Sequence, residues 1–253
     1  MEKVVLANKP LIEAIFEIRW ALKEQAPGLQ IDPYFKLLLG SIYERIKGEY
    51  PFHEELPTVT MPDFISGYIV QHRFRKESNG WPLIQLGPGI MTLNDTQKYN
   101  WDDFERRIDA ILTVLFDLYK DIKITNIILR YIDGIPFDFE GNNIFAFLED
   151  KLKTEIKLPT VLFEDREIKP LPQNIDLLFS FYSSRPSGLA QLRFLRGNSR
   201  GTESLIWETI VQSVASGLPG IKADISTWLN QAHDLTDDWF FELIDGDLRR
   251  SFQ

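Results

Sequence analysis

The sequence contains no cysteine and only three histidines among its 253 residues. The absence of cysteine excludes disulfides, thiolate catalysis, thiolate zinc sites and iron–sulfur clusters. Basic residues are also in deficit, since 28 lysines and arginines stand against 37 aspartates and glutamates and give a net charge of −9. Because phosphate binding needs a basic surface, this balance disfavours a nucleic-acid partner.

Long apolar runs and export signals are missing as well. Charges at Glu2 and Lys3 interrupt the first residues before the apolar region of a secretory signal can form. No segment reaches the length of about 18 apolar residues that crosses a bilayer. We therefore expect a cytoplasmic protein without membrane association.

Aromatic residues, by contrast, are abundant, with 6 Trp, 8 Tyr and 18 Phe. The hydrophobic fraction of 44% suits a chain with a large core and argues against intrinsic disorder. Alternation with a period of two predicts strands, and apolar spacings of three and four predict helices. The predicted strands are 11–20, 64–74, 83–86, 124–135, 175–182, 189–196 and 203–211, and the predicted helices are 33–48, 101–120, 144–153 and 219–243. Asp32 and Asn100 are the predicted N-caps of the first two helices. The predicted core residues on the helices are Trp101, Phe104, Ile108, Leu115, Ile225, Trp228 and Trp239.

The order of these elements begins again near residue 124. The segment 17–20 (EIRW) is similar to 128–131 (ILRY), and 83–86 (LIQL) is similar to 189–192 (LAQL). We predict an α+β fold of two related strand–helix–hairpin–helix modules, 1–122 and 123–253, packed tightly enough to form one structural domain. Antiparallel-rich sheets are expected to carry the long helices on one face. The alternative is one continuous sheet with helices on both faces.

Polar side chains inside the predicted strands are an informative signal, because a buried arginine is costly unless it is solvated or paired. Three interpretations remain open. The residues lie on an open, solvated face, or they form ion pairs with Glu13, Glu17 and Asp133, or they line a pocket for an anion or polar ligand. The candidate ligand-binding residues are Arg19, Arg73, Gln85, Arg130, Gln191 and Arg193.

No catalytic or metal-binding motif stands out. His233 and Asp237 are four residues apart on a predicted helix, which suits two ligands of one ion but does not complete a site. The segment 87–89 (GPG) lacks the glycine spacing of a phosphate-binding loop and is predicted to be a turn. A G-x-S-x-G nucleophile elbow is absent. We therefore predict no catalytic residue, no metal and no cofactor.

Several short motifs together resemble a known family. They are Pro10-Leu11-x-Glu13-Ala14-x-x-Glu17-Ile18-Arg19, Gln85-Leu86, Tyr99-x-Trp101-x-x-Phe104, Arg130-Tyr131-Ile132-Asp133, His233, Phe240 and Phe252. The family is a sporadically distributed, uncharacterised prokaryotic one of about this length, known by a sequence model and not by an activity. The resemblance covers nearly the whole chain and implies a soluble single unit but no chemistry. The chain departs from the family pattern at 133–134, where an amide and then a basic residue are expected.

Three classes of function are compatible with these features. We favour a non-enzymatic binding or interaction protein whose partner is a protein or a polar ligand, with a host-defence or mobile-element system as its hypothesised setting. The alternatives are an enzyme acting on a carbohydrate or nucleotide, and a nucleic-acid-binding protein that uses the strand arginines. A homodimer is also predicted, through an exposed edge strand at 203–211 or an apolar helix face.

Overall fold

The computed structural model describes residues 6–96, 98–219 and 222–253. Its strands are β1 (Leu11–Trp20), β2 (Lys23–Ala26), β3 (Leu29–Ile31), β4 (Phe52–Glu55), β5 (His72–Arg75), β6 (Leu83–Gly87), β7 (Ile90–Asp95), β8 (Ile124–Pro136), β9 (Asp176–Ser184), β10 (Ser187–Ser199) and β11 (Thr202–Ser213). Its helices are α1 (Phe35–Ile46), α2 (Trp101–Leu118), α3 (Ile144–Leu152), α4 (Lys222–Ile244) and α5 (Asp247–Ser251), with short 3-10 turns η1 (Pro57–Thr60), η2 (Thr160–Leu162) and η3 (Ala215–Gly217).

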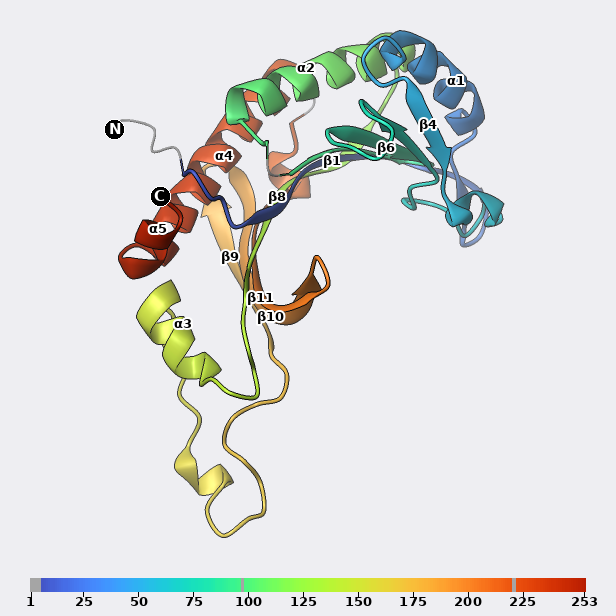
Figure 1. Cartoon of the computed structure of the whole chain (residues 1–253). Helices are drawn as coiled ribbons and strands as arrows, with labels where there is room; N and C mark the ends of the chain where they lie inside the picture. Colours follow the sequence, from blue (N-terminus) through green and yellow to red (C-terminus); the bar gives the residue numbers. More distant parts are fainter. Residues whose placement is uncertain (1–5, 97, 220–221) are drawn as a thin grey trace.

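Nine of these strands form one antiparallel sheet in the order β4-β5-β6-β7-β1-β8-β11-β10-β9, while β2 and β3 form a separate hairpin. The sheet is strongly curved, and α1, α2 and α4 lie along its outer side (Figure 1). The α+β prediction is therefore confirmed. The strands of both predicted modules join the same sheet, because β1 pairs with β8 at its centre. Among the described helices, none is both long and apolar enough to span a lipid bilayer.

The core lies between the sheet and the helices. Alternate side chains of β1 and β8, such as Phe16, Ile18 and Leu129, point into it and contact α2 and α4. A second cluster packs α3, α5 and the end of α4 against β10 and β11. Of the predicted core residues, those that are buried are Trp101, Phe104, Ile108, Leu115, Ile225 and Trp228. The prediction that Trp239 is buried is wrong. Its side chain is only partly buried, and it packs edge-to-face against Phe181 near the edge of the sheet.

Local capping agrees with the sequence at one helix and differs at another. Asn100 is the N-cap of α2 as predicted, and its side chain accepts a hydrogen bond from the Asp103 backbone N–H. The N-cap of α1 is Tyr34, however, and not Asp32. The Asp32 carboxylate instead accepts hydrogen bonds from the Trp20 indole at 2.8 Å and the Gly89 N–H at 3.2 Å. It thereby joins β1 to the β6–β7 turn.

Several predicted strand boundaries are wrong. Of the predicted strand 64–74, only the end is extended, as part of β5. The strands β4 and β7 were not predicted, and β11 lies between β8 and β10 instead of at an edge. The GPG turn is confirmed, since Pro88 and Gly89 join β6 to β7 and Gly89 has a φ of +75°. The helix start was predicted near 219–220; residue 220 lies outside the described residues, and α4 is described from Lys222.

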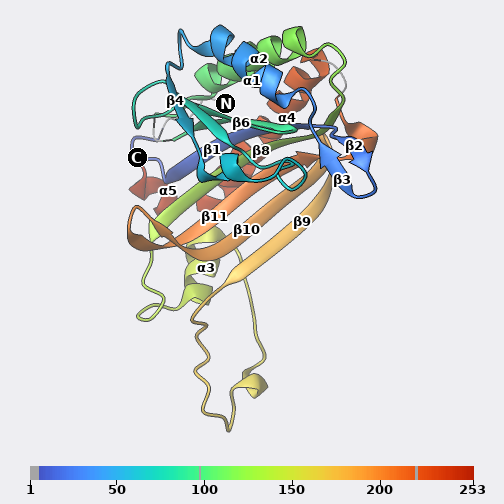
Figure 2. The same cartoon turned by 90° about the vertical axis from the view of Figure 1, so that its right-hand side faces the viewer.

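A long arm separates α3 from β9. Residues 153–175 leave the end of α3, form the short turn η2 and return to the start of β9, well away from the sheet (Figures 1 and 2). The arm exposes four large apolar side chains: Leu158, Val161, Leu162 and Ile168. It is thus a projection of the second half of the chain and not a linker between domains.

Candidate functional site

All six predicted ligand-binding residues lie on the face of the sheet that turns away from α2 and α4. Each alternates along its strand with a side chain of the helix-covered face, as Arg19 does with Ile18 and Arg73 with Phe74. They are nevertheless spread across the sheet. Arg73 and Gln85 lie near the β4 edge, whereas Gln191 and Arg193 lie on β10 next to the opposite edge.

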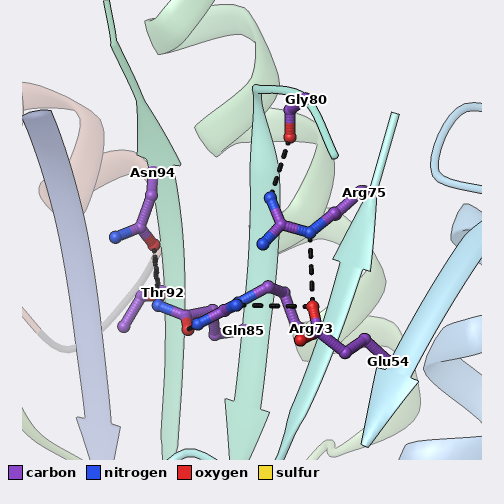
Figure 3. A network of polar contacts seen from close by, with 7 residues as sticks. All are labelled: Glu54, Arg73, Arg75, Gly80, Gln85, Thr92 and Asn94. Carbon is purple, nitrogen blue, oxygen red and sulfur yellow. Dashed lines mark hydrogen bonds and ion pairs between the residues drawn. The ribbon is translucent and has the colours of Figure 1, made fainter. Parts of the chain in front are cut away.

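Near the β4 edge, Glu54 holds two arginines (Figure 3). Its Oε2 atom lies 3.3 Å from Arg73 Nη1 and 3.3 Å from Arg75 Nε. Arg75 also donates to the backbone carbonyl of Gly80 at 3.0 Å, and Arg73 donates twice to the Gln85 side-chain oxygen, at 3.1 and 3.2 Å. Both guanidinium groups are therefore engaged within the sheet.

The network continues towards the centre of the sheet. The Gln85 amide donates to Thr92 and Asn94 at 3.4 Å each, and the Asn94 amide donates to the Glu13 carboxylate at 2.8 Å. Burial raises the pKa of Glu13, while the hydrogen bond from Asn94 and the charges of Arg130 and Arg73 act in the opposite direction. Glu13 thus links the polar groups of the two halves of the sheet.

A second network covers the other half. Arg130 Nη2 lies 2.5 Å from Glu208 Oε1, and Arg193 Nη1 lies 3.9 Å from Glu208 Oε2. Arg193 also forms a bidentate ion pair with Asp176, with N–O distances of 2.6 and 2.7 Å. The remaining two candidates have partners as well, because Arg19 pairs with Glu17 at 2.6 Å and Gln191 donates to Ser180 at 2.9 Å.

Charges on this face balance. The described strands place five arginines and five carboxylates on it: Arg19, Arg73, Arg75, Arg130, Arg193, Glu13, Glu17, Glu54, Asp176 and Glu208. The geometry corresponds to ion pairs on an open face, and a ligand-binding role of the six residues stays a prediction. The predicted ion pairing of the strand arginines with Asp133 is wrong, because Asp133 points to the opposite face of the sheet.

On the helix-covered side, the structure contains a pocket of about 210 Å³ where β8 and β11 meet the start of α2 and the middle of α4. Its lining consists of aromatic rings, three aspartates, one lysine and a few other side chains. The lining residues are Leu6, Lys9, Pro10, Leu11, Tyr99, Asn100, Trp101, Asp102, Tyr131, Asp133, Thr209, His233, Thr236, Asp237, Phe240 and Phe241.

Three of these residues form a hydrogen-bonded chain. The hydroxyl groups of Tyr99 and Tyr131 are 2.7 Å apart, and the Tyr131 hydroxyl lies 3.1 Å from Nδ1 of His233. The His233 ring stacks on Trp101, with 3.8 Å between ring centroids. Burial is the main reason that the pKa of both tyrosines is raised, so the phenols stay neutral. These contacts join the rings of Tyr99, Tyr131, His233 and Trp101 into one aromatic wall of the pocket.

Asp133 and Thr209 supply polar groups without partners. Their exposed fractions are only 3% and 1%. Among the described residues, the Asp133 carboxyl has no hydrogen bond or ion pair, and the Thr209 hydroxyl oxygen has no hydrogen bond. Burial raises the pKa of the Asp133 carboxyl to about 8. Buried polar groups usually have partners, so these two mark a place where a ligand would satisfy them.

The other charged groups around the pocket are Lys9, Asp102 and Asp237. Lys9 donates to the Tyr99 backbone carbonyl at 2.6 Å, and burial lowers the pKa of Lys9 although the charge of Asp95 raises it. His233 and Asp237, whose spacing would suit two ligands of one ion, both line the pocket. No group of three or more metal-ligating side chains occurs among the described residues.

Sequence reasoning missed this pocket, although its residues were already visible as motifs. Residues far apart in the chain that carry the family resemblance meet in its wall. These are Pro10, Leu11, Tyr99, Trp101, Tyr131, Asp133, His233 and Phe240. The signal that could have found the site was the recurrence of aromatic and acidic residues in these motifs, in four separate segments of the chain.

No model of a known protein family matches the chain, and no curated protein matches it. The resemblance to an uncharacterised prokaryotic family therefore stays a prediction.

Proposed function

We propose that the protein is a non-enzymatic binding protein that holds a small organic cation, such as a primary amine, in the pocket between β8, β11 and α4. One observation carries the proposal: the Asp133 carboxyl is buried in the pocket wall with no hydrogen bond or ion pair among the described residues. A cationic ligand supplies the missing countercharge. An isolated buried carboxylate is strongly unfavourable, which makes the site selective for a positive partner.

The rest of the lining supports a cation. An ammonium group has three donors, and the oxygen atoms of Asp133 and Thr209 can accept two of them. Aromatic faces attract cations, and Trp101, Tyr131 and Phe240 surround the same space. The pocket volume of about 210 Å³ lies below the roughly 300–1,000 Å³ of typical drug sites, so we expect a ligand smaller than a typical drug.

Binding of an amine is expected to depend on pH. The group that titrates is Asp133, and the charged or titratable side chains around it are Lys9, Tyr99, Asp102, Tyr131, His233 and Asp237. With a pKa of about 8, Asp133 is protonated at neutral pH and must lose its proton when it pairs with an ammonium group. As the pH is raised towards 8, the affinity should therefore increase about tenfold per pH unit, and above pH 8 it should level off.

The test is calorimetric titration with a panel of small primary amines and with alcohols of the same size. We expect an amine to bind with release of one proton, measured at pH 7 in buffers of different ionisation enthalpy. Asp133→Asn should remove amine binding. The matched control is Asp238→Asn, an exposed aspartate of α4 outside the pocket, which should bind as the unmodified protein does. Equal binding of alcohols and amines, or amine binding unchanged by Asp133→Asn, would overturn the proposal.

The alternative functions receive less support. A nucleic-acid-binding sheet requires a surplus of positive charge, and the open face carries as many carboxylates as arginines. An enzyme requires a reactive group beside an acid or base, and the phenols of the pocket are held neutral by burial. A cytoplasmic location remains part of the proposal, in keeping with a chain that contains no cysteine.

We further infer an internal duplication. The order β1, α1, β5–β7, α2 recurs as β8, α3, β9–β11, α4, which supports two copies of one ancestral unit. The antiparallel pairing of β1 with β8 is the arrangement that a two-fold axis between such copies produces. Superposition of residues 10–120 on 124–245 tests the inference. Arg19 and Arg130 should occupy the same position in their strands, and a different position would contradict it.

A further inference from the structure

The two edge strands of the nine-stranded sheet differ in how well they are protected against pairing with a strand of another chain. β4 has four residues, three of which are His53, Glu54 and Glu55, and such short polar edges resist pairing. β9 has nine residues, DLLFSFYSS, with no lysine, proline or glycine. Among the described strands it pairs with β10 alone, so its outer side presents backbone groups that no described strand pairs with. Exposed edges of this kind are ready to pair with another strand.

Exposed apolar side chains gather at the same edge. Among the described residues, 14 large apolar side chains are exposed, and 8 of them lie between residues 158 and 182. Four belong to the arm, and the other four belong to β9: Leu178, Phe179, Phe181 and Tyr182. Tyr182 is 92% exposed. A concentration of apolar surface in one-tenth of the chain indicates an interaction surface.

We propose that β9 pairs antiparallel with β9 of a second copy of this chain, about a two-fold axis that passes through Ser180. The sequence of the strand is self-complementary about that residue. Phe179 of one copy faces Phe181 of the other, and Leu178 faces Tyr182. Both members of each pair lie on the same side of the sheet, because their numbers share parity. Aromatic and apolar cross-strand pairs of this kind stabilise antiparallel sheets.

Charge favours the same partner. Although the chain has a net charge of −9, β9 contains one charged residue, Asp176, which Arg193 of the same chain already neutralises. In the proposed register Asp176 faces Ser184 of the second copy, so the exposed Arg185 that follows lies beside it. The two-fold axis repeats this contact at the other end of the strand. The strand itself therefore brings no unpaired negative charge into the contact between the two acidic chains.

The first experiment measures mass by sedimentation velocity over about a hundredfold range of protein concentration. We expect a reversible dimer whose dissociation constant rises at least about tenfold in Tyr182→Lys and in Leu178→Glu, because each variant places a charge against an apolar side chain. The double variant, which combines the two substitutions, brings opposite charges face to face across the two-fold axis and should restore the dimer. A monomer at every concentration, or a dimer that neither single variant weakens, would overturn the proposal.

The second experiment tests the register and exploits the absence of cysteine. Ser180→Cys places two thiols on the two-fold axis, where strand spacing allows a disulfide, so mild oxidation should give a covalent dimer. The matched control is Ser184→Cys at the exposed end of the same strand. Its two thiols lie roughly 27 Å apart in this register, eight residues at about 3.4 Å each, and should not join. Equal cross-linking of both variants would refute the register.

Discussion

The two faces of the central sheet hold their charges in opposite ways. On the open face, each of the five arginines is paired with a carboxylate at the strand surface. On the helix-covered face, where water has less access, Asp133 is buried with no such partner among the described residues. Neutral Tyr99 and Tyr131 lie in the same pocket wall.

The difference shows where a ligand can contribute most free energy. A ligand that binds the open face must displace existing ion pairs and so gains little. A ligand that enters the pocket satisfies groups that the protein leaves without partners, and the desolvation of those groups was already incurred on folding. The number of charged side chains on a surface is therefore a weaker guide to a binding site than the lack of partners among them.

The largest expected effect is the pH dependence of stability that the buried Asp133 carboxyl causes. In the unfolded chain an aspartate has a pKa of about 3.9, whereas burial raises the pKa of Asp133 to about 8. Between these values the folded protein keeps a proton that the unfolded chain has lost, so stability must fall as pH rises. As the pH rises from 4 to 8, the free energy of unfolding of the unmodified protein should fall, relative to that of Asp133→Asn, by up to about 1.4 kcal/mol per pH unit.

Urea unfolding of both proteins at a series of pH values measures this slope. The variant Asp238→Asn is the control, because its aspartate is exposed. A stability difference between the unmodified protein and Asp133→Asn that does not change with pH would show that this carboxyl is not desolvated, and the contrast between the two faces would disappear.

A smaller effect is expected when two neighbouring residues of one strand, one on each face of the sheet, are truncated and the losses of unfolding free energy are compared. Leu205 of β11 is fully buried on the helix-covered face, and Ile206 lies half-buried on the open face. Leu205→Ala should reduce the free energy of unfolding by about 2–5 kcal/mol, as large-to-small changes in cores do. Ile206→Ala should cost less than half as much. If denaturation shows equal losses, the open face is as densely packed as the core.

The smallest effect is the difference in stability that two ion pairs of the open face contribute. The Glu208 side chain is 5% exposed beside Arg130, which is 33% exposed, so Glu208→Gln should cost about 1–3 kcal/mol. Arg193→Gln removes the exposed pair with Asp176 and should leave the melting temperature unchanged within error. A greater loss in Arg193→Gln than in Glu208→Gln would show that the outer part of the network carries the stability.

Periodic patterns predicted the helices α1 to α4, but not the short α5, and the strands that alternate in burial, such as β1 and β8. They failed at β7, whose six residues are all buried, because a strand buried on both faces has no alternation. They also placed β11 at an edge. Alternation in β11 reports that one face is buried, but the neighbours of a strand are set by pairing between distant segments.

The candidate site shows the same limit. The sequence could indicate that the strand arginines share a face, because their positions follow strand parity. It could not show that Asp133 and Thr209 lack partners, since that depends on how α4 covers β8 and β11. The spacing of His233 and Asp237 was the one local hint, and the structure places both in the pocket without a third metal ligand among the described residues.

The pairing of β1 with β8 also sets the timing of assembly on the ribosome. β1 ends at residue 20 and β8 ends at residue 136, so the second neighbour of β1 is synthesised more than a hundred residues later. At about 5–20 residues per second, the nascent chain spends on the order of ten seconds with one side of β1 bare. Until β8 is made, β1 is itself an edge strand open to pairing with other chains, an exposure that the finished sheet removes.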